Sequence, residues 1–217
     1  METGQDSFWV VIAECLKAMF EGYKFALLSK SPRRALLLQE MGLEFQVVKP
    51  GIDEVCPDGT LALEAPSCLS RQKALACQDT IGEDVVKIAA DTVVIIDGEI
   101  LGKPKDKAEA VEMLRKLSGR TNQVVTGVTV AWKDKLSVFS EVTDVKFAVL
   151  SDEEINFYID QYRPYDKAGA YGIQEWIGLT GIESIHGCYY NVMGLPVSRL
   201  YRELKKMLAG SAFAEKY

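Results

Sequence analysis

Short apolar runs alternate along the chain with segments whose apolar residues recur at helical spacing. Two apolar runs, 25–28 and 85–96, predict strands that are buried on both faces, although three polar residues interrupt the second. Between such runs, apolar positions three and four residues apart predict helices that each pack one face. The predicted strands span 25–28, 44–48, 85–96, 123–132, 136–149 and 182–192, and the predicted helices span 32–42, 66–80, 106–119, 151–162 and 195–208.

Local signals at the ends of these segments support the assignment. Asp97-Gly98 is a strong hairpin turn signal, and Asp106 is suited to cap the helix that follows it. Ser151 and Glu154 have the spacing of a capping box. Because long antiparallel strands occur beside elements that alternate with helices, the chain predicts an α/β fold. We expect a mixed sheet with helices on its sides, divided into two lobes.

The first residues form a separate segment. Residues 8–13 are apolar, but they are too few to cross a membrane and lack the preceding basic residues of a signal peptide. An amphipathic leader helix is one interpretation, and a natural start of translation at Met19 is the other. We therefore expect an extension or leader helix over 1–22, a single catalytic domain of two lobes over 23–210, and a frayed tail over 211–217.

Composition and charge exclude several classes of protein. A formal net charge of -6 argues against a protein that binds nucleic acid regardless of sequence, because such proteins present a basic face. The five cysteines are odd in number and show no regular spacing, which favours reduced thiols and a cytoplasmic location. The single histidine, His186, excludes a histidine-rich zinc site, and we interpret it as structural.

The segment 29–34, Ser-Lys-Ser-Pro-Arg-Arg, directly follows the first apolar run. Ser31 can cap a helix and Pro32 fits its first turn, so unpaired backbone N–H groups would face whatever lies before the helix. Arg33 and Arg34 add guanidinium groups, which bind phosphate with paired hydrogen bonds. This pattern predicts a polyphosphate site, and the alternative is an ordinary capped helix with solvated arginines.

Asp91 lies inside the apolar run 85–96, where an ionised carboxylate is costly unless it is paired or bound to metal. It is therefore a candidate for holding a divalent metal or activating water. Exposure at a sheet edge, or pairing with a core lysine, is the alternative.

Other charged residues are weaker candidates by themselves. Asp53 and Glu54 could add oxygen ligands for a magnesium ion, which needs only one or two carboxylates besides substrate phosphates. Lys73, Lys103 and Lys167 could each contact a phosphate group. Each of these residues alone is more typical of a solvated surface.

Short motifs follow one another between about Tyr23 and Lys206. They are Ser29–Arg34, Ile52–Glu54, Gln72–Ala74, Ala90–Thr92, Gly102–Pro104, Leu117–Thr121, Thr126–Val128, Asp166–Gln174 and Asn191–Pro196. In this order and spacing they resemble the Maf family of nucleoside triphosphate pyrophosphatases. The resemblance implies an elongated mixed α/β fold with two lobes around a central cleft, related to the inosine triphosphate pyrophosphatases.

The resemblance also implies a reaction and its residues. A nucleoside triphosphate would be hydrolysed between its α- and β-phosphates, with Asp91 as the acceptor of the water proton. A divalent cation, Mg²⁺ or Mn²⁺, would be held by Glu54 and Asp91, and the partner implied besides the substrate is a second copy of the chain in a homodimer. The residues expected to line the phosphate and metal region are Ser29, Arg33, Arg34, Glu54, Lys73 and Lys103.

Substrate preference within the family differs at three positions, which here hold Arg33, Thr92 and Gln174. This combination resembles the members that act on dTTP and UTP, and a glutamine amide can pair with a uracil or thymine edge. A non-catalytic nucleotide-binding regulator of cell division is the alternative from another class, and a general phosphatase is a third hypothesis.

Overall fold

The computed structural model describes residues 20–53 and 55–209. Within them, the chain forms a seven-stranded sheet. Six strands follow one another in the order β2-β1-β3-β5-β6-β7, and the seventh, β4, pairs only with β3. The sheet is mixed, because β1 pairs in parallel with β2 and β3, whereas β3, β5, β6 and β7 pair antiparallel. The strands are β1 (Lys24–Leu28), β2 (Phe45–Val47), β3 (Val85–Ile96), β4 (Glu99–Leu101), β5 (Thr121–Trp132), β6 (Lys135–Phe147) and β7 (Ile182–His186).

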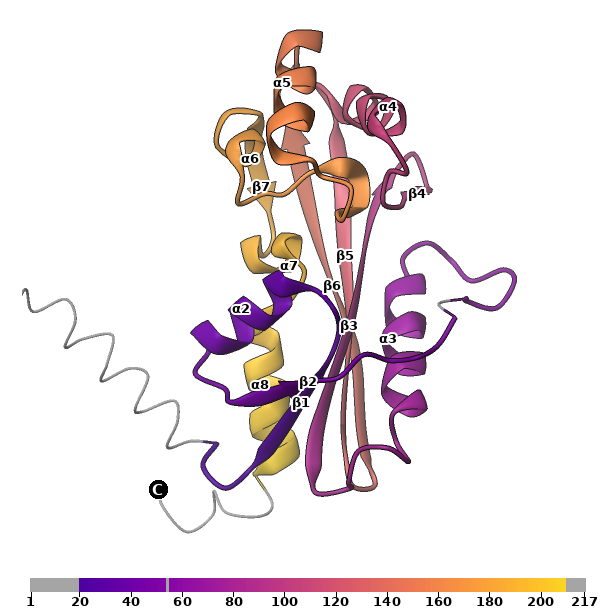
Figure 1. The fold of residues 1–217 in the computed structure, drawn as a ribbon, viewed down its shortest axis with the longest axis vertical. Coiled ribbons are helices and arrows are strands. Elements are labelled where there is room, and N and C mark those ends of the chain that lie inside the picture. Colours follow the sequence, from indigo (N-terminus) through magenta and orange to yellow (C-terminus); the bar gives the residue numbers. More distant parts are fainter. Residues whose placement is uncertain (1–19, 54, 210–217) are drawn as a thin grey trace, which may run out of the picture.

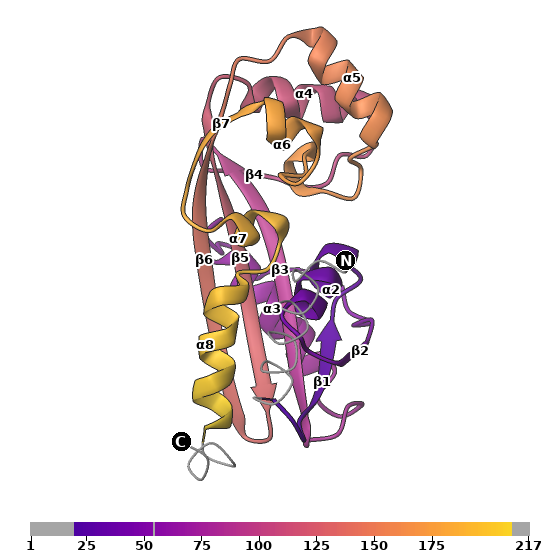
Figure 2. The same cartoon turned by 90° about the vertical axis from the view of Figure 1, so that its left-hand side faces the viewer.

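Long strands give the molecule its elongated shape, because β3, β5 and β6 run through nearly its full length (Figure 1). Helices gather around both ends of these strands (Figures 1 and 2). The helices are α2 (Pro32–Glu40), α3 (Ala65–Ala76), α4 (Lys107–Leu117), α5 (Asp152–Tyr162), the 3₁₀ turn η1 (Ala168–Ala170), α6 (Trp176–Thr180), α7 (Tyr189–Met193) and α8 (Val197–Leu208).

Two large apolar cores lie at the two ends of the long strands. One is formed by α2, α8 and one half of the sheet, around residues such as Leu38, Ile88 and Leu204. The other is formed by α4, α5 and the opposite half, around Leu114 and Tyr158. We call these the α2/α8 lobe and the α4/α5 lobe, and this arrangement agrees with the two lobes expected from the sequence.

The edge of β3 between the two lobes is open. β1 pairs with β3 only as far as Leu28 and Ala89, and β4 begins to pair with it at Val94. The opposite edge of β3 is occupied throughout by β5. Residues 90–93 therefore lie in a gap between β1 and β4, where side chains from both faces of the strand can reach one space.

Helix α3 covers the face of the sheet opposite α2 and α8, and it packs very closely on β5. A Cβ atom at Gly127 would lie 2.2 Å from the backbone carbon of Pro66 and 2.2 Å from the backbone nitrogen of Ser67. Only glycine permits this approach. The approach places the buried residue Lys73, on the next turns of α3, over the middle of β3.

The predicted helix caps and turn are confirmed with one change. Asp106 accepts a hydrogen bond from the backbone of Glu109, and Ser151 forms the complete capping box with Glu154. Asp97 and Gly98 both have positive φ, as the tight turn between β3 and β4 requires. Ser31 precedes α2 with extended geometry, but its side chain makes no capping hydrogen bond.

The segment predicted as a strand over 182–192 was only half right. The strand β7 ends at His186, Gly187 follows with a φ of 133°, and the chain then forms α7. A Cβ at Gly187 would lie 2.8 Å from the hydroxyl of Thr143, so the chain leaves the sheet at a place that only glycine fits. The short helix α6 was not predicted, and α3 ends at Ala76 rather than near residue 80.

Most of the expected leader helix over 1–22 lies outside the described residues, as does the tail over 211–217. Phe20 is buried in the α2/α8 lobe beside Phe25 and Tyr201. Among the helices that can be described, none has both the length and the apolar character needed to cross a membrane.

Candidate active site

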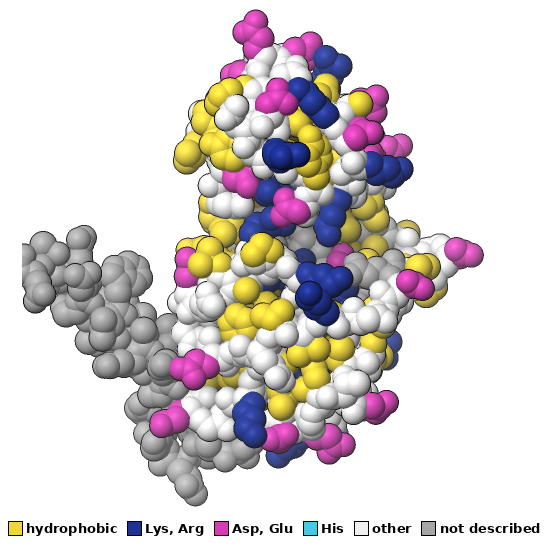
Figure 3. Space-filling model, in the orientation of Figure 1, with side chains coloured by type: hydrophobic (Ala, Val, Ile, Leu, Met, Phe, Trp, Pro, Cys, Tyr) yellow, Lys and Arg dark blue, Asp and Glu magenta, His cyan; other side chains and the backbone are white. Residues whose placement is uncertain are grey.

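A cleft of about 460 Å³ opens at the gap in the edge of β3, between the two lobes. Lys and Arg side chains gather in this hollow (Figure 3). Six basic residues line it, Lys30, Arg33, Arg34, Lys73, Lys103 and Lys167, against two carboxylates, Asp91 and Asp166. The described lining therefore carries a formal charge of +4, in a chain whose net charge is -6. Such a local concentration of positive charge is suited to a small polyanion.

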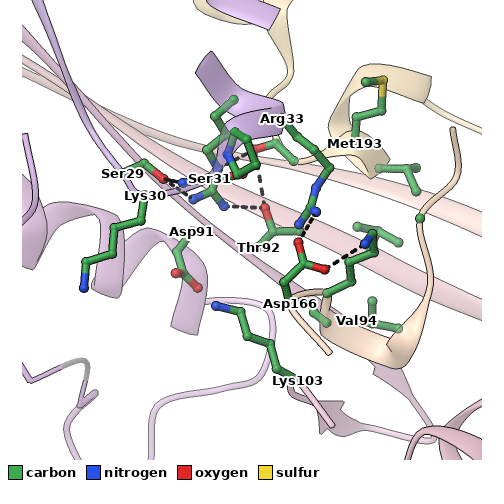
Figure 4. Close-up of a pocket in the computed structure, with 18 of the residues that line it drawn as sticks. Ser29, Lys30, Ser31, Arg33, Asp91, Thr92, Val94, Lys103, Asp166 and Met193 are labelled. Carbon is green, nitrogen blue, oxygen red and sulfur yellow. Dashed lines mark hydrogen bonds and ion pairs between the residues drawn. The ribbon is translucent and has the colours of Figure 1, made fainter. Parts of the chain in front are cut away.

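Arg34 anchors the start of α2 to three other parts of the chain. Its guanidinium donates to Oγ of Ser29 at 3.0 Å, to Oγ1 of Thr92 at 2.9 Å and to the carbonyl of Gly194 at 2.8 Å. Only 9% of Arg34 is exposed. Ser29 in turn accepts from the backbone N–H of Ser31 at 3.2 Å, which fixes the turn before the helix (Figure 4). Ser29 and Arg34 thus have a clear structural role in shaping the predicted polyphosphate site.

Asp91 faces the cleft and is paired with a buried lysine. Nζ of Lys73 donates to Oδ1 of Asp91 at 2.7 Å, and the two side chains are only 7% and 14% exposed. Oδ2 accepts no hydrogen bond from any described residue. The alternative interpretation, pairing with a core lysine, is therefore confirmed, and the same carboxylate also lines the cleft.

Arg33 reaches across the cleft to the α4/α5 lobe. Its Nη1 donates to Oδ2 of Asp166 at 2.6 Å, and Nζ of Lys167 donates to Oδ1 of the same carboxylate at 2.7 Å (Figure 4). Burial alone would raise the pKa of Asp166, but hydrogen bonds from Lys167 and Arg33 hold it below its ordinary value. Sequence reasoning did not single out Asp166, although it immediately precedes the lysine that was considered.

Lys167 is also paired with a second carboxylate, that of Glu175. Its Nζ lies 3.1 Å from Oε1 of Glu175, and Glu175 accepts a short hydrogen bond from the hydroxyl of Tyr158. That hydroxyl also accepts from the backbone N–H of Gly172 at 3.0 Å. Burial, followed by the contact with Glu175, raises the pKa of Tyr158, so the phenol stays protonated. The loop 166–175 is thereby fixed to α5, and it carries Gln174 into the cleft lining.

The structure treats three remaining candidates, Lys103, Thr92 and Glu54, differently. Lys103 lines the cleft from the segment after β4, and its ammonium is directed toward the space in front of Asp91 (Figure 4). Thr92 lines the cleft, but its hydroxyl is engaged by Arg34 and by Thr126 at 2.9 Å. Glu54 lies outside the described residues.

Two further residues lie away from the site. Asp53 is exposed and does not line the cleft. His186 is exposed at the end of β7, opposite Asp144, and has no contact with the cleft.

The donor atoms in the cleft are compatible with a magnesium-type ion that is coordinated partly by the protein and partly by the phosphates of a bound substrate. Within the described residues, no three His, Cys, Asp or Glu side chains are grouped to hold a metal. Asp91 still offers a carboxylate oxygen that no described donor occupies. Mg²⁺ commonly uses one or two carboxylates together with substrate phosphates and water, so this donor set fits.

Comparison with known proteins gives consistent matches over nearly all of the residues that the structure describes. The sequence profile described as Maf-like protein matches residues 24–207. A dTTP/UTP pyrophosphatase from Bacteroides fragilis is 50% identical over 192 residues, covering 88% of this chain and 99% of that protein. The protein of the same name from Phocaeicola vulgatus is 52% identical, covering 86% and 97%, and that from Porphyromonas gingivalis is 53% identical, covering 84% and 94%.

Solved structures give more distant matches. A HAM1 protein from Coxiella burnetii aligns with 58% of this chain and 73% of its own at a TM-score of 0.40 and 15% identity. At that distance the likeness says nothing about the function of this chain.

Proposed function

The chain belongs to the Maf-like protein family, and we propose that it is a nucleoside triphosphate pyrophosphatase that hydrolyses dTTP and UTP to the monophosphate and pyrophosphate. The observation that carries this proposal is a carboxylate, Asp91, in the lining of a cleft that also has six basic side chains. Relatives about 50% identical along their full length are named for the same activity.

In the proposed mechanism Asp91 is the general base. Its Oδ2 accepts a proton from a water molecule as that water attacks phosphorus, and the bond to the leaving pyrophosphate oxygen breaks. Lys73 holds Oδ1 at 2.7 Å, so the carboxylate, which lines the cleft, cannot rotate freely. Pre-set orientation of this kind lowers the barrier to in-line attack.

The basic residues would hold the triphosphate and stabilise the charge that develops on the leaving group. Arg33, Lys103 and Lys167 reach the cleft from different segments, so a polyphosphate tail would be contacted from both lobes. Arg34 would contribute mainly by keeping Ser29 and Thr92 in place, since its guanidinium already bonds to both.

We also propose that a divalent cation, Mg²⁺ or Mn²⁺, is held by Asp91 and Glu54 together with phosphate oxygens. When bound, such an ion neutralises charge on the phosphates and polarises the phosphorus under attack. The proposal is supported by Oδ2 of Asp91, which has no described donor and offers two acceptor positions, so that one could hold the ion while the other faces the attacking water.

Base selection is assigned to the loop 166–175 and to Arg33 and Thr92. Gln174 is exposed in the cleft lining beside the rigid turn at Gly172, where its amide can both donate to and accept from a pyrimidine edge. We further propose a homodimer, which follows from the family resemblance alone, and a cytoplasmic location, which the odd number of irregularly spaced cysteines favours.

An assay that identifies products tests the function. Purified protein is incubated with dTTP, UTP, CTP or 7-methyl-GTP and either Mg²⁺ or Mn²⁺, and the products are separated. We expect dTMP or UMP with pyrophosphate, and little turnover of 7-methyl-GTP. Release of orthophosphate would indicate a general phosphatase, and binding of dTTP without turnover would indicate a non-catalytic regulator.

A further inference from the structure

Asp166 occupies an unusual position for a carboxylate in a site that would bind polyphosphate. Each of its two oxygens is bonded to a different cation of the cleft, Arg33 at 2.6 Å and Lys167 at 2.7 Å. These are charge-assisted hydrogen bonds, and they use the donors that a phosphate group would need. Asp166 thus engages two donors that are also suited to a phosphate group.

The three side chains differ in how far they are exposed to solvent. Asp166 is 54% exposed, whereas Arg33 is 23% exposed and Lys167 is 9% exposed. The carboxylate is therefore the most exposed of the three side chains, all of which line the cleft. Lys167 keeps a second partner, Glu175, when the bond to Asp166 is lost, so it would remain in position while releasing that carboxylate.

The pair also joins the two lobes. Arg33 lies in the first turn of α2, in the α2/α8 lobe, and Asp166 lies in the loop after α5, in the α4/α5 lobe. The carboxylate of this pair is open to solvent, and ion pairs that solvent reaches contribute little to stability, so this contact is weak enough to exchange with a ligand.

From these contacts we propose that Asp166 is a positioning residue that acts as an internal substitute for phosphate: it keeps Arg33 and Lys167 directed into the cleft and competes with polyphosphate for them. It thereby weakens the binding of pyrophosphate, so that this product leaves after hydrolysis. The inference rests on the proposed function, because the product whose release it explains is pyrophosphate.

The test compares the affinity of inorganic pyrophosphate for the wild type and for Asp166→Asn, measured by titration calorimetry at low salt. We expect the variant to bind pyrophosphate about 3- to 10-fold more tightly, the range for removing competition from exposed ion pairs. The gain should shrink as salt is added, because the interactions are partly exposed. Inhibition of dTTP turnover by pyrophosphate should strengthen by the same factor.

Asp160→Asn is a matched control. Asp160 lies in the same lobe, its side chain is also 54% exposed, and it pairs with Lys107 at 2.5 Å outside the cleft. Asp160→Asn removes the same charge as Asp166→Asn. If both variants gained equally in affinity for pyrophosphate, the gain would come from the change in net charge and would contradict the role proposed for Asp166. Asp166→Glu keeps the charge and should stay within about 2-fold of the wild type.

Unchanged or weaker binding of pyrophosphate in folded Asp166→Asn would overturn the proposal, because a purely structural role predicts loss and never gain. If that variant unfolds early in a thermal scan, Asp166→Ser is titrated instead with the same expected gain. The binding experiment needs no turnover. Absence of hydrolysis by the wild type would therefore reject the proposed function, whereas absence of the gain rejects only the role of Asp166.

Discussion

Asp91 is the residue at which the proposed chemistry can be tested most directly. Asp91→Asn keeps the shape of the side chain and an oxygen that can accept from Lys73, but it removes the base. We expect turnover of dTTP to fall by about 10²- to 10⁴-fold, the usual range for loss of a general base. Steady-state kinetics measure the loss, and calorimetry with dTTP shows whether binding persists.

Asp53→Asn provides the comparison for that substitution. Asp53 is exposed, lies outside the cleft lining and loses the same charge. It should keep nearly all of the activity. If Asp91→Asn retained rates near those of the wild type, Asp91 would not be the base.

What the sequence could reveal at this scale depended on whether a residue was unusual in its local context. Asp91 stood out because it interrupts an apolar strand, and the structure places it in the cleft. Asp166 did not stand out, because its partner Arg33 is 133 positions away and only the fold brings them together. Arg34 was predicted to contact phosphate, and its bonds to Ser29, Thr92 and Gly194 could not be foreseen for the same reason.

At the scale of elements, the contact between α3 and β5 controls the position of Lys73. Gly127→Ala would place a methyl group 2.2 Å from the helix backbone, so α3 must shift away from the sheet. We expect a loss of about 1–3 kcal/mol in the free energy of unfolding, the usual cost of overpacking. Turnover of dTTP should fall as well, because Lys73 moves together with its helix.

Chemical denaturation and kinetics on the same preparation measure both effects. Gly51→Ala is a suitable control, because a Cβ at Gly51 meets no atom within 4 Å and its φ is not positive. Full stability in Gly127→Ala would mean that α3 does not pack as closely as described.

The capping box of α5 provides a prediction that depends on pH. Ser151→Ala removes the oxygen that accepts from the backbone of Glu154, which should cost about 1 kcal/mol at neutral pH. Hydrogen bonds first from the backbone and then from the side chain of Ser151 lower the pKa of Glu154. The charged form is therefore the stabilising one, and its contribution is complete above the ordinary glutamate pKa of 4.5.

That contribution is lost as the pH falls through the lowered pKa of Glu154. Thermal unfolding of the wild type and Glu154→Gln at several pH values measures it, and the two curves should converge in acid. Glu153→Gln, in the same helical turn but outside the capping box, should show no such convergence. Parallel curves for Glu154→Gln down to strongly acid pH would contradict the assigned capping role.

Elements with a strong apolar pattern were predicted well, because helical spacing marks the face of a helix that packs and a continuous apolar run marks a strand buried on both faces. β3 was predicted with the same bounds that the structure shows, 85–96. The segment 182–192 failed because its apolar and polar residues fit either a strand or a short helix. Gly187 decides between them through a contact with Thr143 on a distant strand.

At the scale of the whole molecule, the class of fold followed from the order of elements, but the place of the cleft did not. It depends on β1 ending at Leu28 while β3 continues, and on β4 returning to the same edge only at Val94. Strand pairing of this kind is set by contacts between residues far apart in the chain. The sequence could therefore supply candidate site residues without showing how two lobes bring them together.

The cleft concentrates like charges, and this has a consequence for the stability of the whole molecule. Lys103 is exposed, lines the cleft and is paired with no described residue. Because the surrounding lining is already positive, Lys103→Gln should raise the free energy of unfolding of the ligand-free protein by up to about 0.5 kcal/mol. The same substitution should weaken binding of pyrophosphate by about 10-fold, as expected for one charge-assisted contact.

Calorimetric scans with and without pyrophosphate measure both effects together. At 100 times its Kd, pyrophosphate should stabilise the wild type by about 2.7 kcal/mol and raise Tm by about 5–11 °C. At the same concentration Lys103→Gln should gain roughly half of that free energy, while starting from an equal or higher Tm. Lys105→Gln, two residues away and outside the cleft, should keep the full shift. An equal shift in both variants would mean that Lys103 does not reach the ligand, and that the positive charge of the cleft is not what binds it.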